Sequence, residues 1–163
     1  MIKIATIEDI AIIRNIAYNT WPSTFGEILT KEQIAYMLDM MYAEEVLKNH
    51  IQNGTQTFLI YVDENEPQGF AAYEAMPHNG KLKIHKIYLL PSSQGKGIGK
   101  KLFSYLEQTA KDLNLLRTSL NVNKYNKAIH FYNKLGYQKV KTEIIDIGHG
   151  FIMDDFVMEK ILN

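Results

Sequence analysis

Three alternating glycines between a strand and a helix constrain this chain more than any other feature of its sequence. Residues 84–101 read IHKIYLLPSSQGKGIGKK, with Gly95, Gly97 and Gly99 near the end. Glycine adopts positive φ easily and lets a ligand approach the backbone, while a helix start offers unpaired N–H groups and the positive end of a dipole. The segment therefore predicts a cradle for a phosphate or pyrophosphate. Three nearby lysines add positive charge: Lys96, Lys100 and Lys101.

Two common phosphate-binding patterns do not fit this glycine-rich segment. The P-loop requires a glycine, four residues of any type and then Gly-Lys-Ser/Thr, which GKGIGKK does not supply. The dinucleotide pattern GxGxxG would need glycine at Lys100. The plain alternative is that the glycines only make a tight turn from strand to helix, without a ligand.

The rest of the chain predicts a mixed α/β (α+β) fold in one domain, residues 1–163, a length that suits a single domain. Periodicity and turn residues indicate strands at 2–5, 57–62, 68–76, 81–90, 117–122, 137–147 and 151–161. They indicate helices at 6–21, 31–41, 43–53, 98–113 and 126–135. Thr6 caps the first helix and Pro22 ends it. The short loops favour antiparallel pairing, so we expect a central, mostly antiparallel sheet with helices on both faces.

The overall composition excludes several classes of partner and site. With 18 Lys+Arg and 18 Asp+Glu the formal net charge is zero, which removes the electrostatic case for nucleic acid or an acidic membrane as partner. The absence of cysteine excludes a disulfide scaffold, a thiolate zinc site and a cysteine nucleophile. Because there is neither a signal peptide nor an apolar run of about 20 residues, we expect a cytoplasmic protein. Four histidines lack metal-ligand spacing, and we expect no metal: His50, His78, His130 and His149.

Two segments resemble the signatures of the GNAT superfamily of acyl-CoA-dependent N-acyltransferases. Gln94–Gly99 (QGKGIG) matches the family's Q/R-x-x-G-x-G/A pattern, and residues 123–137 (NKYNKAIHFYNKLGY) resemble its N…A…FY…LG-F/Y segment. The two occur in the family's order, and the predicted elements match its fold over nearly the whole chain. The resemblance implies a GNAT-like single domain that uses acetyl-CoA as co-substrate and transfers the acetyl group to a primary amine.

The resemblance also implies how acetyl-CoA is held. Backbone groups of Ile87, Tyr88 and Leu89 on the strand would pair with the pantetheine arm. An N–H near Leu89 would polarise the thioester carbonyl. The loop and the first helical turn would bind the pyrophosphate: Gln94, Gly95, Lys96, Gly97, Ile98, Gly99 and Lys100. Tyr125 stands where the family usually has an asparagine. In the family this asparagine contacts CoA. Asn126 is therefore the nearest candidate for the CoA contact and Asn123 is the next, although either could simply cap the helix.

Candidates for proton transfer follow from the same resemblance and from side-chain chemistry. Tyr132 occupies the family's tyrosine, which often protonates the departing thiolate or hydrogen-bonds the sulfur, although it could equally be a core aromatic. Some members use a strand glutamate as base, but here the strand reads Lys83-Ile84-His85. His85 shares a face with Lys83 and Ile87 and is the candidate base. The alternatives are that His85 is only a packed or surface histidine, that Glu74 on the neighbouring strand is the base, or that a water chain takes the proton.

The acceptor is less well defined than the donor. The early helices are rich in aromatic residues and methionine, which predicts either a helix–helix core or an adaptable pocket. Acidic residues in those helices and in the last hairpin would suit a cationic amine, and the front half is similar to bacterial spermidine/spermine acetyltransferases. We therefore expect a primary amine as acceptor. Polyamine is one candidate, and a peptide N-terminus, a protein lysine, an amino acid and an aminoglycoside are the others. A non-catalytic acyl-CoA sensor is the alternative function, and a homodimer is compatible with the exposed edge of the last hairpin.

Overall fold

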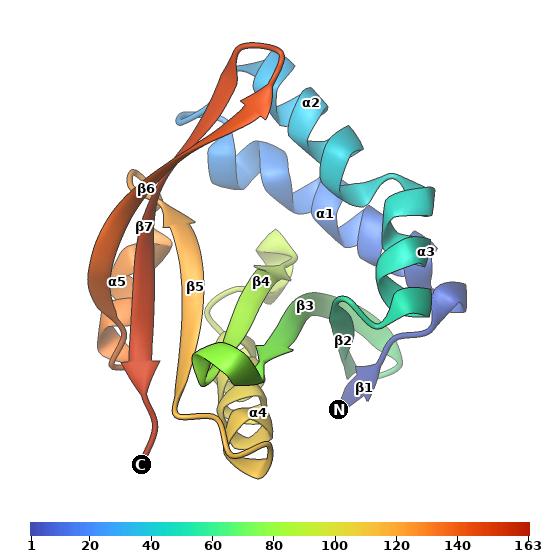
Figure 1. Cartoon of the computed structure of the whole chain (residues 1–163). Coiled ribbons are helices and arrows are strands. Elements are labelled where there is room, and N and C mark those ends of the chain that lie inside the picture. The colour runs from blue at the N-terminus through green and yellow to red at the C-terminus, as the bar shows by residue number, and fades with distance from the viewer. The chain divides into compact units, whose positions relative to one another are not determined.

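The computed structural model describes residues 1–163, and its elements follow the predicted order (Figure 1). The strands are β1 (Ile2–Ile4), β2 (Thr57–Asp63), β3 (Glu66–Met76), β4 (Lys81–Leu89), β5 (Arg117–Asn123), β6 (Gln138–Gly148) and β7 (Phe151–Ile161). The helices are α1 (Ile10–Phe25), α2 (Lys31–Tyr42), α3 (Glu44–Asn53), α4 (Ile98–Asp112) and α5 (Ala128–Lys134). Short 3-10 turns lie at η1 (Ile7–Asp9), η2 (Pro77–Asn79) and η3 (Pro91–Ser93).

The seven strands are hydrogen-bonded in the order β1-β2-β3-β4-β5-β7-β6. β4 and β5 run parallel, whereas β1 with β2, β2 with β3, β5 with β7, and β6 with β7 are antiparallel. The predicted mixed α/β class and the mostly antiparallel sheet are therefore confirmed.

The contacts of the chain divide it into two compact units. The first comprises Met1–Glu74 with His85–Tyr105, and the second comprises Ala75–Ile84 with Leu106–Asn163. Strands β3 and β4 each contribute residues to both units. The prediction of a single domain stays a prediction.

The helix starts follow the predicted capping chemistry, but the end of α1 does not follow the prediction. Thr6 Oγ1 accepts a hydrogen bond from the Glu8 N–H, and Asp9 Oδ2 accepts one from the Thr6 N–H at 2.9 Å, so Thr6 caps η1, which leads into α1. Pro22 was expected to end the helix, yet α1 continues to Phe25. A proline removes one helical donor, but the Pro22 carbonyl still accepts from the Gly26 N–H at 2.9 Å, so the last turn closes.

In the second unit, β6 and β7 form a long antiparallel hairpin (Figure 1). Its turn is the predicted Gly148-His149-Gly150, where all three residues have positive φ. The register between the two strands shifts between Lys139 and Lys141. No helix of the structure combines the length and the apolar character needed to cross a membrane.

The core of the first unit contains a buried lysine among aromatic rings. Lys86 on β4 is only 5% exposed, and its ammonium lies 5.4 Å from the centre of the Phe58 ring and 5.9 Å from that of Tyr42. Its Nζ donates a 2.7 Å hydrogen bond to Gln56 Oε1. No carboxylate forms an ion pair with it, and burial lowers the pKa of Lys86 from its usual 10.5 to about 8.

We expect this burial to give the stability of the protein a measurable dependence on pH. Between pH 8 and pH 10.5 the unfolded chain holds a proton on Lys86 that the folded chain has released, so the free energy of unfolding rises with pH in that window. The rise from pH 8 to pH 10 should be about 2 kcal/mol. Urea unfolding should show that Lys86→Met lacks this rise, while Lys48→Met, at an exposed position of α3, keeps it. Equal slopes in wild type and Lys86→Met would contradict the assignment.

Candidate active site

The glycine-rich loop turns the chain from β4 into α4 through two left-handed residues. Gly95 has φ +77° and Gly97 has φ +79°, a region that other residues rarely adopt. A Cβ built on either glycine meets no atom within 4 Å, so the space beside the backbone is open. The path of the loop therefore depends on glycine at both positions.

The base of this loop is fixed by a strand residue that sequence analysis missed. The fully buried Ser93 donates from its hydroxyl to Gln68 Oε1 on β3, and the Gln68 carbonyl accepts from the Leu90 N–H at 2.9 Å. The Gln94 side chain donates to the Leu89 carbonyl at 3.3 Å. Gln68 lies far from the loop in sequence and belongs to no motif, so only the fold could reveal its role.

The start of α4 provides the donors that an anion requires. The Lys101 N–H bonds to the Gly97 carbonyl at 3.2 Å. The N–H groups of Ile98, Gly99 and Lys100 precede this bond, in the turn where helical donors have no intrahelical acceptor. The helix dipole adds partial positive charge there, so the loop and helix start are chemically suited to a phosphate.

The predicted alternation along β4 is visible in its burial. Leu82, Ile84 and Lys86 are buried, whereas Lys83, His85 and Ile87 between them are partly exposed. Registered pairs between β4 and β5 run from Lys81 with Arg117 to Ile84 with Leu120, and both strands continue beyond the last of these pairs.

The structure brings together two residues that the sequence offered as separate candidates for the base. His85 Nε2 lies 2.9 Å from Glu74 Oε1, and the side chains are 21% and 38% exposed. Because a carboxylate only accepts, the ring nitrogen is the donor in this hydrogen bond. The two residues lie on different strands, and the sequence carried no signal of their contact.

Tyr132 lies on α5 in the second unit and is 9% exposed. Its ring centre is 6.0 Å from that of Phe131 and 6.3 Å from that of Tyr137. Burial raises the pKa of Tyr132 to about 12, so its hydroxyl keeps its proton throughout the physiological range. The side chain is thus a protonated hydrogen-bond donor beside other aromatic rings. This is compatible both with a donor to the CoA sulfur and with a core aromatic residue.

Both candidate asparagines make local turns. Asn123 Oδ1 accepts from the Tyr125 N–H, and Asn126 Oδ1 accepts from the Ala128 N–H, each at 2.9 Å. Asn126 therefore satisfies a donor at the start of α5 through a local turn, while the N-cap residue itself is Lys127. A contact of either side chain with CoA stays a prediction.

The aromatic residues of the early helices are mostly core. Trp21 and Tyr42 are almost fully buried and pack edge to face with ring centres 5.9 Å apart. Trp21 also lies 5.8 Å from the ring of Tyr88 on β4, in the same unit. The rings of these two helix residues therefore form part of the core beside β4. An adaptable pocket in the early helices stays a prediction.

The acidic residues of the last hairpin differ in their partners. Asp154 forms an ion pair with Lys124, and Asp146 accepts from the Gly148 N–H in the turn. Asp155 is 2% exposed and accepts from the Asn121 amide at 3.3 Å, without an ion pair. Burial raises the pKa of Asp155 above its usual value.

Comparison with known proteins agrees with this arrangement of loop, helix and strands. Residues 27–157 match the family model of the acetyltransferase (GNAT) domain. A spermidine N(1)-acetyltransferase of Thermoplasma acidophilum is 27% identical, with 98% of this chain and 95% of the relative aligned. A Lactobacillus delbrueckii subsp. lactis protein, named only as an uncharacterized N-acetyltransferase, is 28% identical over 90% of this chain and 88% of its own.

A solved structure is similar over the whole chain. The PaiA N-acetyltransferase of Thermoplasma acidophilum in complex with coenzyme A superposes with a TM-score of 0.85, at 28% identity and with 99% of each chain covered. The family model covers most of this chain, and the relatives are N-acetyltransferases. The chain therefore belongs to the GNAT acetyltransferase family and is an acetyl-CoA-dependent N-acetyltransferase.

Proposed function

We propose that this protein acetylates a small polyamine, and that it does so by direct attack of the amine on acetyl-CoA in a ternary complex. The observation that carries the use of acetyl-CoA is the loop from β4 to α4, where two left-handed glycines leave open space beside a helix start. The absence of cysteine removes the usual acyl-thioenzyme route, which favours direct transfer. A cytoplasmic location is part of the proposal.

The pyrophosphate of acetyl-CoA would lie on the amides of Gly95 to Lys100, with the Lys96 and Lys100 ammonium groups nearby. The residues present fit this group, because a Cβ at Gly95 or Gly97 would meet no protein atom and a phosphate can approach the backbone there. Backbone groups of Ile87, Tyr88 and Leu89 would hold the pantetheine arm. An N–H near Leu89 would polarise the thioester carbonyl as negative charge develops on its oxygen.

Transfer forms a C–N bond to the amine, breaks the C–S bond and leaves a thiolate that needs a proton or a hydrogen-bond donor. Tyr132 would supply the donor. Since burial raises the pKa of Tyr132 to about 12, complete proton transfer to a thiolate whose conjugate thiol has a pKa near 8.5 is uphill, by on the order of 5 kcal/mol. A hydrogen bond to the sulfur in the transition state is therefore the role that this environment favours.

The attacking amine must lose a proton before or during the transfer. His85 would accept it, directly or through a water, because imidazole titrates near neutral pH. The partly exposed side of β4 on which His85 lies is compatible with access of a water. The strand has no glutamate at this position, so histidine takes the role that a carboxylate has in some members of the family.

A polyamine acceptor is supported by one relative and by the chemistry of the last hairpin. The relative aligned over 98% of this chain is named a spermidine N(1)-acetyltransferase. Asp155 is a buried carboxylate without an ion pair, a group that a cationic amine could neutralise.

The proposal predicts turnover with polyamines in a thiol-release assay. Acetyl-CoA would be presented with spermidine, spermine, amino acids, short peptides and aminoglycosides, while CoA binding is followed in parallel. We expect spermidine or spermine to give the highest kcat/KM. Turnover with short peptides alone would replace the polyamine by a peptide amine. CoA binding without turnover on any of these amines would contradict the proposed polyamine acetylation and favour a non-catalytic acyl-CoA sensor.

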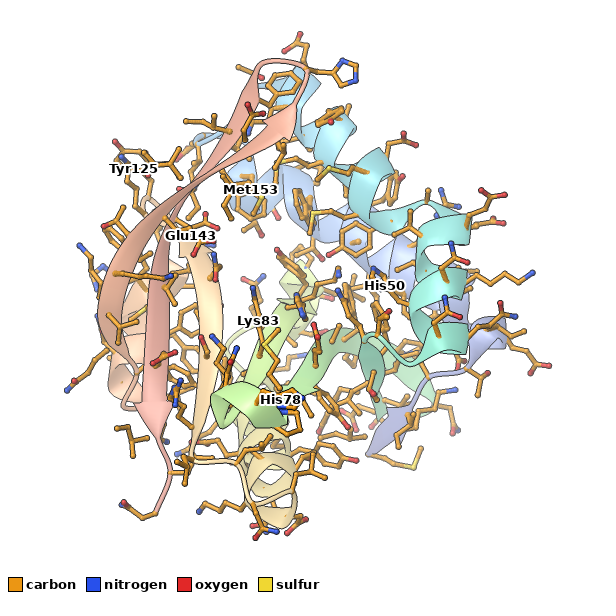
Figure 2. The ribbon with its side chains drawn as sticks, viewed as in Figure 1. His50, His78, Lys83, Tyr125, Glu143 and Met153 are labelled. Carbon is orange, nitrogen blue, oxygen red and sulfur yellow. The ribbon has the colours of Figure 1, made fainter.

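The role of Tyr132 predicts a selective loss of turnover in Tyr132→Phe. The variant should lower kcat on the order of 10- to 100-fold, while the Kd for CoA stays within about twofold of wild type. The matched control is Tyr125→Phe, because Tyr125 belongs to the same segment but lies at the surface (Figure 2). A Tyr132→Phe variant with wild-type kcat would exclude Tyr132 from the chemical step.

A further inference from the structure

The contact between Glu74 and His85 has a specific chemical consequence for the histidine. Glu74 Oε1 accepts from His85 Nε2, with 2.9 Å between the two atoms, and both residues belong to the first compact unit. With the proton of the neutral ring held at Nε2, its basic nitrogen is Nδ1. A carboxylate beside an imidazole also stabilises the imidazolium form, so the pair favours uptake of a proton at Nδ1.

The charge of Glu74 is not neutralised by a lysine or arginine. His85 is its sole ion-pair partner, whereas the Asp9 carboxylate pairs with Lys3 and Glu44 pairs with Arg14. Among these ion pairs, the Glu74 carboxylate therefore acts on the imidazole alone.

Other titratable groups lie around the pair. His50 on α3 points toward the strands, with its ring centre 6.5 Å from that of Phe58 on β2 (Figure 2). Burial and the charge of Lys86 lower the pKa of His50, and Glu74 partly offsets that effect. On β4 itself Lys86 follows His85 and Lys83 precedes it by two residues. Glu74 is the carboxylate in hydrogen-bond contact with His85, so its substitution should act mainly on that ring.

We propose that Glu74 is a positioning residue, which orients His85 through Nε2 and strengthens Nδ1 as the acceptor of the proton from the substrate ammonium. The inference rests on the proposed function, because it assigns His85 to that proton. In the step, the ammonium gives one proton to Nδ1, and the neutral amine forms the C–N bond as the C–S bond breaks. The second proton lost from the nitrogen goes to the departing thiolate, which leaves as CoA thiol, and the imidazolium releases its proton to solvent. Glu74 touches neither substrate.

The first test does not depend on activity. The titration of His85 is followed by NMR in wild type and in Glu74→Gln, with His78 of η2 as an internal reference in the same spectra (Figure 2). We expect the pKa of His85 to be lower by about one pH unit in Glu74→Gln and that of His78 to be unchanged. An unchanged titration of His85 in a folded variant would overturn the proposal.

The second test is the pH dependence of kcat/KM with the best amine of the panel. Ionisation of the substrate is common to all variants, so differences between them report on the enzyme. Glu74→Gln should move the low-pH (acid) limb of the kcat/KM profile to lower pH by about one unit and lower kcat about 10-fold. Glu74→Asp should keep this limb near that of wild type. Glu66→Gln, at the exposed start of β3, should match wild type throughout.

The two claims can fail separately. Absence of turnover by wild type with every amine would contradict the proposed function, while the NMR titration would still test the contact of Glu74 with His85. Turnover with an acid limb that does not move in Glu74→Gln would overturn the positioning role and leave the acetyltransferase intact. His85→Gln should abolish the acid limb, and a retained limb would assign the proton to another group.

Discussion

The left-handed backbone at Gly95 and Gly97 is the constraint on which the candidate site depends. β4 must turn within a few residues into α4, and side-chain-bearing residues rarely adopt these backbone angles. The same two residues leave the backbone open on one side, because a Cβ would have no neighbour there. Ser93 and Gln68 then fix the base of the loop to β3. The geometry that makes the turn thus also leaves open space beside the loop that leads into α4.

Adjacent residues of β4 face opposite environments and illustrate how one strand serves both core and site. Lys86 is buried against aromatic rings, with Gln56 as its hydrogen-bond partner and its pKa lowered by burial. His85, the preceding residue, is partly exposed and contacts Glu74. A buried charge without a counter-ion costs stability, so the strand retains polar chemistry on both faces at some expense of folding free energy.

Much of the fold followed from local patterns in the sequence. The order of the elements, the cap at Thr6, the hairpin turn at Gly148-His149-Gly150 and the mostly antiparallel sheet were predicted correctly, because each depends on nearby residues. Pro22 was misjudged, because a proline in the last turn costs one donor without blocking the closing hydrogen bond.

The site was predictable only where its residues are contiguous. The loop from Gln94 to Lys100 could be read directly because glycine spacing and helix start lie together. The contact of Glu74 with His85 joins two strands, and that of Gln68 with Ser93 joins β3 to the η3 turn, so only the fold reveals them. The burial of Lys86 had no signal either, since a lysine within an alternating strand is normally expected at the surface.

The most direct measurement of the central claim is a calorimetric titration of CoA into Gly97→Val and Gly54→Val. Both substitutions place a branched side chain at positive φ with open space around it, and Gly54 at the end of α3 is separate from the loop. The backbone strain is thus matched, and thermal unfolding checks that both variants are folded. We predict that Gly97→Val weakens CoA binding by about 100-fold, equivalent to about 2.7 kcal/mol, and that Gly54→Val binds like wild type. Wild-type affinity for CoA in folded Gly97→Val would contradict the claim that this loop binds the pyrophosphate of CoA.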